Sequence, residues 1–154
     1  MSQEYANEIK RVVAELLARI NISATIEEGV LLDGPCFDIK SADSNLLVGE
    51  NGQHLLALHT VVKKIIERKF PQEQPPFLLD VNDYQRRRIE EVKDRARMSA
   101  QRVRYFKKEV VMQPMSAYER RIVHVALAED PDVTTESVGE GEMRRVVIKP
   151  AQTV

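Results

Sequence analysis

The sequence contains no tryptophan, and aromatic residues make up only 5% of its 154 positions. A base-stacking sheet of the RNA-recognition-motif type would need more aromatic side chains, so that class of protein is not expected. Cys36 is the single cysteine, which excludes an internal disulfide and a zinc cluster built from cysteines. A reducing, cytoplasmic location is the expectation that follows.

Long apolar runs and recognisable catalytic groupings are also missing. No apolar segment approaches the roughly 20 residues needed to cross a bilayer, and the first residues lack the pattern of a signal peptide. There is no Ser/His/Asp grouping, no pair of catalytic carboxylates and no Walker-type loop. His54 and His59 stand five residues apart, which is poor helical spacing for a shared metal. We therefore expect no enzyme activity, cofactor, metal or membrane-spanning segment.

The formal net charge of −1 hides a local concentration of basic residues. Residues 1–82 carry 8 basic and 12 acidic side chains, whereas residues 83–121 carry 12 basic and 6 acidic ones. Residues 122–143 then hold 6 acidic side chains and no Lys or Arg. A basic segment of this kind indicates a partner that carries phosphates, whatever the charge of the whole chain.

Apolar spacing in the first half predicts a mixture of helices and short strands. The turn between the two strands is expected at residues 33–35, where Gly34 and Pro35 occur together. The expected elements are a helix over residues 4–20, strands over 23–28 and 36–39, a short helix over 41–47, a long helix ending near 69, and a strand over 77–81.

The second half is predicted to begin with one long helix over residues 84–109, which contain neither Gly nor Pro. Pro114 ends that pattern. Ser116 and Glu119 form a capping-box signature for a helix over residues 117–128. Strands are expected over 133–138 and 144–148, so the fold class predicted for the whole chain is α+β.

A glycine-bracketed tetrad, Gly49-Glu50-Asn51-Gly52, stands between two predicted helices. Two such glycines allow a sharp turn and a close approach of backbone amides to a phosphate, although a plain interhelical turn has the same signature. The order helix, strand, strand, short helix, Gly-x-x-Gly, helix, strand resembles the type II KH domain (αββααβ), whose loop clamps a nucleotide backbone. Glu50 departs from the Lys or Arg that is usual in such loops, and its carboxylate repels phosphate.

A second motif, Arg120-Arg121-Ile122-Val123-His124, places an Arg and a His four residues apart on one helix face. Arg120 could hold a phosphate while His124 donates a hydrogen bond to a base or stacks on it. Alternatively, His124 is buried and hydrogen-bonded, and holds the helix against the strands. Together with Arg144, Arg145 and Lys149, the segment from Met115 to Lys149 resembles the R-3-H domain, a domain associated with single-stranded nucleic acid.

Basic side chains also follow the whole length of the predicted long helix, where they form either a solvated face or a surface that attracts phosphates. We take them as support for nucleic-acid binding. These residues are Arg86, Arg87, Arg88, Arg95, Arg97, Arg102 and Arg104.

A KH domain over residues 1–82, followed by a long basic helix and an R-3-H domain over 83–154, resembles the bacterial Jag family (SpoIIIJ-associated proteins). The resemblance implies a cytoplasmic protein that binds single-stranded RNA, with single-stranded DNA as the alternative ligand. It implies an RNA chaperone or post-transcriptional regulator linked to cell elongation or division, with a small stand-alone KH-domain protein as partner. The competing interpretation is a protein-interaction adaptor beside the membrane-insertase machinery, with incidental RNA contact.

Overall fold

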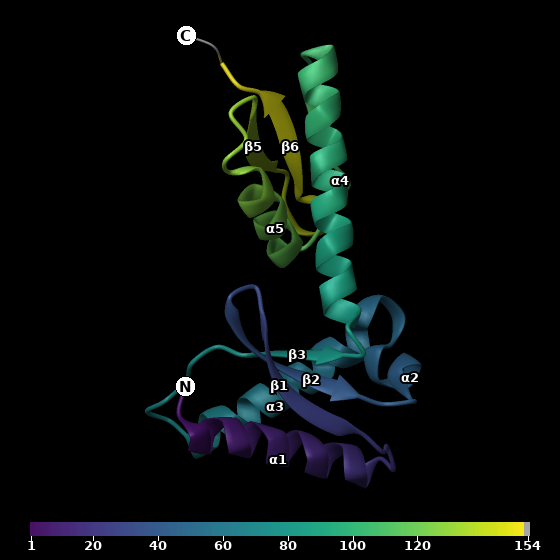
Figure 1. Cartoon of the computed structure of the whole chain (residues 1–154), viewed down its shortest axis with the longest axis vertical. Helices are drawn as coiled ribbons and strands as arrows, with labels where there is room; N and C mark the ends of the chain where they lie inside the picture. The colour runs from purple at the N-terminus through teal and green to yellow at the C-terminus, as the bar shows by residue number, and fades with distance from the viewer. Residues whose placement is uncertain (153–154) are drawn as a thin grey trace. The chain divides into compact units, whose positions relative to one another are not determined.

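The computed structural model describes residues 1–152 and shows a mixed α+β fold (Figure 1). The chain divides into two compact units, an N-terminal unit, Met1–Arg86, and a C-terminal unit that begins at Arg87. The long helix α4 (Tyr84–Phe106) starts within the last residues of the first unit. In residues 1–152, no helix has both the length and the apolar character that a bilayer span requires.

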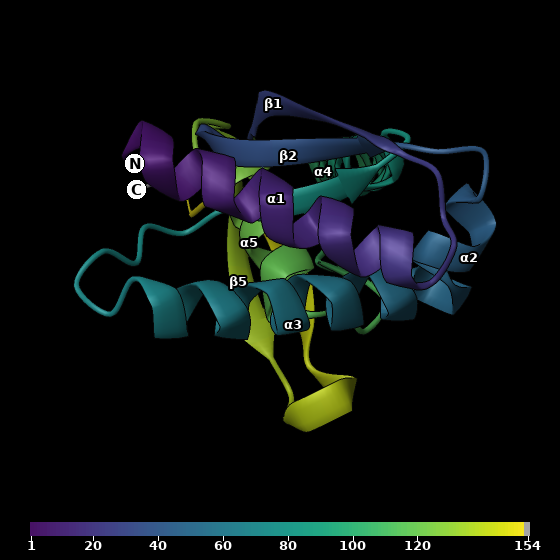
Figure 2. The same ribbon diagram turned by 90° about the horizontal axis from the view of Figure 1, so that it is seen from below.

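The N-terminal unit has the element order predicted from its sequence. Its sheet has the order β1-β2-β3, with β1 and β2 antiparallel and β2 and β3 parallel. The two long helices, α1 and α3, cover one face of this sheet (Figure 2). The elements are α1 (Gln3–Arg19), β1 (Thr25–Leu31), β2 (Gly34–Lys40), α2 (Ser44–Val48), α3 (Gln53–Lys69) and β3 (Leu78–Val81).

Most aromatic residues of the N-terminal unit lie in its core. The rings of Tyr5, Phe37 and Phe77 are buried and meet edge to face, and Phe70 packs against Tyr5 in the same way. Such edge-to-face pairs add to the free energy gained from burying the rings. The few aromatic side chains in this half of the chain are therefore used for packing and are not available as a stacking surface.

The hairpin turn differs from its sequence-based prediction. The strands extend to Leu31 and Gly34, so the two turn residues are Leu32 and Asp33, with φ of 50° and 61°. Two central residues with positive φ match the right-handed twist of a hairpin, but Leu rarely adopts this conformation. Pro35 lies inside β2, one residue before that strand begins to pair with β3. Its missing N–H therefore costs no hydrogen bond to β3.

Asp80 fixes the start of α4. Its side chain is 1% exposed and accepts hydrogen bonds from the backbone amides of Gln85, at 2.7 Å, and Arg86, at 3.3 Å. These amides belong to the first turn of α4, where N–H groups have no partner within the helix. Burial raises the pKa of the Asp80 carboxyl, and its bonds to backbone amides act in the opposite direction.

The C-terminal unit combines two helices with a second sheet, in which all strands are antiparallel and the order is β4-β6-β5. Helix α4 ends three residues earlier than predicted, because Lys107 adopts a φ of 58° and the chain turns into β4. Strand β4 was not predicted. The elements after α4 are β4 (Val110–Val111), α5 (Ala117–Leu127), β5 (Val133–Val138) and β6 (Arg145–Pro150).

The core of the C-terminal unit is built from one apolar stripe on each of its helices and from the centre of β6. The α4 stripe contains Ala96 and Ala100, both fully buried, whose small side chains allow neighbouring elements to approach the helix backbone. The capping box predicted for α5 is confirmed, because Ser116 Oγ accepts from the Glu119 amide while the Glu119 carboxylate accepts from the Ser116 amide.

Candidate nucleic-acid interface

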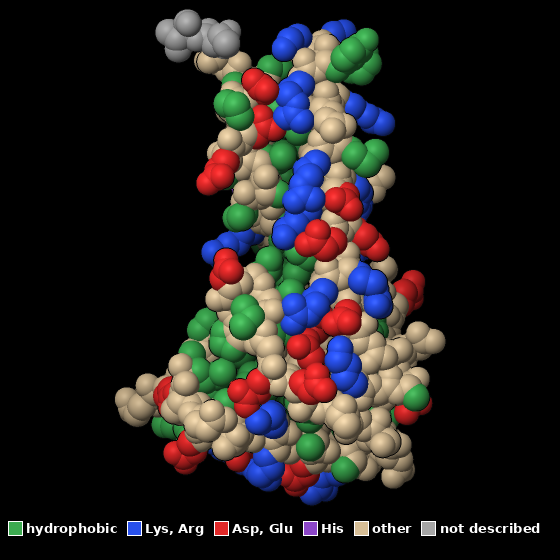
Figure 3. Space-filling view, in the orientation of Figure 1, with side chains coloured by type: hydrophobic (Ala, Val, Ile, Leu, Met, Phe, Trp, Pro, Cys, Tyr) green, Lys and Arg blue, Asp and Glu red, His purple; other side chains and the backbone are tan. Residues whose placement is uncertain are grey.

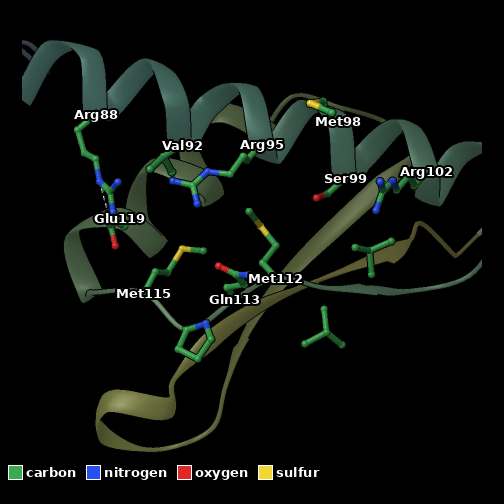
Figure 4. A pocket seen from close by; sticks show the side chains of 13 residues that line it. Arg88, Val92, Arg95, Met98, Ser99, Arg102, Met112, Gln113, Met115 and Glu119 are labelled. Atoms are coloured by element: carbon green, nitrogen blue, oxygen red, sulfur yellow. Dashed lines mark hydrogen bonds and ion pairs between the residues drawn. The ribbon is translucent and has the colours of Figure 1, made fainter. Parts of the chain in front are cut away.

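Three arginines of α4 face one cavity of the C-terminal unit. Arg88, Arg95 and Arg102 recur every seven residues, about two helical turns, so they share one face of the helix. They extend toward the segment that carries Met112, Gln113 and Met115 (Figure 4). We call this space of about 400 Å³ the α4 cavity. It is lined by Arg88, Val92, Arg95, Met98, Ser99 and Arg102 of α4, by residues 110–115, and by Glu119.

The three guanidinium groups are not equivalent. Arg88 is engaged by Glu119, at 3.3 Å, and by Glu91, at 3.7 Å. Arg95 and Arg102 are exposed, and neither makes a hydrogen bond or ion pair with any residue from 1 to 152. They stand about 10 Å apart along the helix axis, given a rise of about 1.5 Å per residue. The α4 cavity is thus lined by two permanent positive charges without counter-charges.

The remaining walls of the α4 cavity are largely neutral. Ser99 and Gln113 offer hydrogen-bonding groups, while Met98 and Met115 offer flexible thioether side chains. Glu119 is the one acidic residue in the lining, and its carboxylate is already used by Arg88 and by the cap of α5. This combination of free cations with adaptable neutral groups suits a polyanion that carries planar rings.

Other basic residues of α4 are tied to the protein itself, although Lys and Arg side chains gather along this helix in Figure 3. Arg86 donates to the Val30 carbonyl, at 2.8 Å, and pairs with Asp38, at 3.2 Å. Arg97 pairs with Asp94 at 3.2 Å. Two further arginines of the predicted basic face also have partners: Arg104 pairs with Asp130, and Arg87 is exposed but has a partner of its own.

The Arg-x-x-x-His motif has a clear structural role. His124 Nδ1 lies 2.6 Å from Thr135 Oγ1, and its Nε2 lies 2.9 Å from Ser137 Oγ. Both ring nitrogens are therefore occupied by hydroxyl groups of β5. Burial, and then the charge of Arg120, lower the pKa of His124, which favours the neutral ring. The sequence left open a His124 that contacts RNA or one that is buried and hydrogen-bonded, and in the structure the ring is hydrogen-bonded to β5 but only half-buried.

Arg120 supports the wall of the α4 cavity. Its Nη1 donates to the Met115 carbonyl at 2.9 Å, and its side chain is half-buried. It also lines a second, more open space together with Ser116 and Glu142. Arg121, by contrast, is exposed and has no partner within the described part of the chain. The first arginine of the motif thus positions the segment before α5.

The basic residues near β6 stabilise the connection between β5 and β6. Arg144 Nη1 donates to the Gly139 carbonyl at 2.7 Å, and Arg145 Nε donates to the Met143 carbonyl at 3.1 Å. Lys149 pairs with Glu136 across the sheet at 2.7 Å, which raises the pKa of the lysine. The structure therefore does not bring the predicted site together as one cluster of free cations.

The Gly-x-x-Gly segment forms a compact turn between α2 and α3. Gly49 has a φ of 71°, and a Cβ there would lie 2.5 Å from Cγ of His54, whose ring is held by the Leu46 carbonyl. Gly52 precedes α3 in the left-handed region, and a Cβ there would lie 3.1 Å from the Tyr84 ring. Glu50 and Asn51 are exposed. Local packing alone therefore accounts for a glycine at both positions. A turn with no binding role would require the same two glycines.

Sequence reasoning missed the neutral lining of the α4 cavity. Met98, Ser99 and Gln113 belong to no motif, and Gln113 lies two residues after β4, a strand that the sequence did not predict. The seven-residue recurrence of Arg88, Arg95 and Arg102 was the available signal, since it places three cations on one face among a dozen scattered basic residues.

Comparison with known proteins supports the assignment of the second half. Residues 87–150 match the R-3-H domain family, which confirms the resemblance of this region to that domain. The chain is also similar to bacterial proteins named RNA-binding protein KhpB. It is 36% identical to the Clostridium symbiosum protein over 111 residues and 32% identical to the Bacillus subtilis protein over 114 residues.

These alignments cover 72% and 73% of this chain but only 50% and 54% of the two relatives. The chain thus spans about half the length of the curated relatives it matches. A third relative of the same name, from Lactiplantibacillus plantarum, is 33% identical over 103 residues, which are 32% of its length. The resemblance of residues 1–82 to a KH domain stays a prediction.

Proposed function

We propose that this protein binds single-stranded RNA through the α4 cavity. The observation that carries the proposal is the pair of unpartnered guanidinium groups, Arg95 and Arg102, on the cavity-facing side of α4. A guanidinium presents a planar fork of donors that matches a phosphate oxygen pair. The neutral side chains between the two arginines leave space for the bases. The relatives are named RNA-binding proteins, which agrees with this function.

The strength of binding is expected to depend steeply on salt. Each phosphate neutralised by an Arg or Lys releases condensed counterions, with a log–log slope of about −0.7 per contact for a single strand. With Arg95 and Arg102 both engaged, we expect a slope of about −1.4 or steeper for a single-stranded RNA oligonucleotide. The measurement is fluorescence anisotropy at several salt concentrations. An affinity that does not change with salt would contradict the electrostatic mechanism.

We also propose that the N-terminal unit is a KH-type module whose loop, Gly49 to Gly52, faces RNA. The support is its element order and the 17-residue helix α3, whose N-cap Gly52 has no side chain to bond the first amides. The Gln53 amide already donates to the Glu50 carbonyl, so we expect the amides that follow it in the first turn to bind a phosphate. Since Glu50 is exposed beside them, its negative charge weakens the attraction.

The Glu50→Lys variant is therefore expected to bind single-stranded RNA more tightly than the wild type, by roughly two- to tenfold at low salt, because a repulsive charge becomes an attractive one. Glu50→Gln, which only removes the charge, should give a smaller gain. Anisotropy titrations of the three proteins test this. Equal affinities, with unchanged melting curves, would mean that this loop does not face the RNA.

The cellular role that we propose is that of a non-enzymatic cytoplasmic RNA chaperone or post-transcriptional regulator, acting with a small stand-alone KH-domain protein. This role rests on the Jag-family resemblance and on the names of the relatives. Crosslinking in cells, followed by sequencing of the bound RNA, tests it. Recovery of a reproducible set of transcripts is the expected result, and absence of enrichment over an uncrosslinked control would contradict it.

A further inference from the structure

Two neighbouring aromatic side chains at the end of α4 are strongly exposed. Tyr105 is 81% exposed and Phe106 is 63% exposed, with ring centroids 4.8 Å apart and planes at 81°. The sequence has only four Tyr and four Phe, and most of the others are buried or half-buried in the N-terminal unit. Packing within the C-terminal unit therefore does not account for this pair, which leaves a large apolar surface in water.

Basic residues surround the two rings. Arg102 precedes Tyr105 by three residues and Phe106 by four, so it lies next to both on the helix surface. Lys107 and Lys108 follow directly and are exposed. Glu109 is the one acidic residue among these neighbours in sequence. Apolar and basic side chains also lie together at this end of α4 in Figure 3.

The aromatic pair continues the lining of the α4 cavity. Arg95, Met98, Arg102 and Tyr105 succeed one another at steps of three and four residues, which keeps them on one side of the helix. The first three line the cavity. A strand that follows the two free arginines along α4 toward its C-terminal end therefore meets the rings of Tyr105 and Phe106 next.

We propose that Tyr105 and Phe106 stack on bases of the bound single strand, while Arg102, Lys107 and Lys108 hold the flanking phosphates. The proposal rests on the RNA-binding function proposed above. It adds two residues that contact the flat faces of the bases. Charge complementarity favours a nucleic acid over an apolar protein surface, because three cations flank the rings. Aromatic stacking accepts any base, so it contributes affinity without sequence preference.

The test compares the Tyr105→Ala/Phe106→Ala double variant with the wild type on two probes. One probe is a single-stranded RNA oligonucleotide of mixed sequence, and the other is an abasic oligonucleotide of the same length and backbone charge. Since stacking on an aromatic side chain is worth about 1–3 kcal/mol per base, affinity for the first probe should fall by ~5- to 150-fold. Affinity for the abasic probe and the salt slope should stay unchanged.

Two further variants separate ring chemistry from folding. Tyr105→Phe keeps a stacking surface and should retain wild-type affinity. Phe106→Trp places a single indole in a chain that has no tryptophan, and its fluorescence should be quenched when the RNA oligonucleotide is added, but not when the abasic probe is added. A circular dichroism melt of each variant confirms that the exposed substitutions leave the fold intact.

Failure of this proposal is distinguishable from failure of the proposed function. If the wild type binds RNA in a salt-dependent way and the double alanine variant binds equally well, the stacking proposal is overturned and the function stands. If the double variant loses the same factor on both probes, the rings do not act through bases, and the proposal is again overturned. If sedimentation shows that the wild type self-associates through these rings and the double variant does not, they serve a protein contact instead. If the wild type binds neither probe, the proposed function itself fails.

Discussion

Replacing Arg95 and Arg102 together by Gln is expected to lower the affinity for single-stranded RNA by ~10- to 100-fold. Hydrogen bonds to charged groups are worth about 1.5–3 kcal/mol each, and exposure to solvent and salt reduces that value here. The log–log salt slope should also become shallower by about 1.4, since two phosphate contacts are lost. Anisotropy titrations at several salt concentrations measure both quantities.

The matched control is Arg97→Gln. Arg97 lies on the same helix and is also exposed, but its guanidinium pairs with Asp94 at 3.2 Å and does not line the α4 cavity. Its replacement removes one positive charge, as does each of the single variants Arg95→Gln and Arg102→Gln, so an effect of net charge alone would weaken binding equally in all three. An equal loss in Arg97→Gln and in either single cavity variant would contradict the assignment of the cavity as the binding surface.

The His124→Ala variant is expected to lower the free energy of unfolding of the C-terminal unit by about 1–3 kcal/mol. The substitution removes a half-buried ring and leaves the hydroxyl groups of Thr135 and Ser137 without their partner. Binding by the folded variant should equal that of the wild type. Thermal melts beside RNA titrations test this, with exposed Val125→Ala on the same helix as control. A stable variant with weakened binding would show instead that His124 contacts RNA.

The same histidine is also expected to make the stability of the C-terminal unit depend on pH. Burial holds the pKa of His124 below 6.5, its ordinary value, so the unfolded chain binds protons that the folded chain does not. Stability of the C-terminal unit should therefore decline as the pH falls from about 6.5 toward the lower folded pKa, and be insensitive to this group above 6.5. Amide hydrogen exchange of β5 measures the stability of the C-terminal unit at each pH. His124→Ala should lose this acid sensitivity, and an unchanged profile would contradict the account.

Much of the fold could be predicted because its signals are local. The stripe of α1, the capping box before α5 and the order of elements around Gly49 and Gly52 are all read from spacing within a few residues. The turn at Leu32 and Asp33 was misplaced, because the Gly34-Pro35 pair is the stronger turn signal in sequence. Strand β4 was missed because two residues, Val110 and Val111, are too few to show an alternating pattern.

The binding surface was predicted less well, because the availability of a cation depends on partners far away in sequence. Arg86 and Asp38 are 48 residues apart, and Arg88 and Glu119 are 31 residues apart. The seven-residue recurrence groups Arg88 with Arg95 and Arg102, but no local pattern shows that Arg88 has a partner and the other two have none. Likewise, the spacing of Arg120 and His124 is visible in the sequence, but the hydroxyl groups that occupy His124 come from β5.

Crosslinking of the purified protein to thiouridine-substituted single-stranded RNA, with mass-spectrometric mapping of the modified residues, tests the central claim most directly. The α4 cavity lies between residues 88–102 of α4 and residues 110–115, and the stacking pair lies at the end of the same helix. We predict that the major crosslinks in the C-terminal unit fall at Met98, Tyr105, Phe106, Met112 or Met115. Crosslinks concentrated at His124 and β5, with none between residues 95 and 115, would contradict the account.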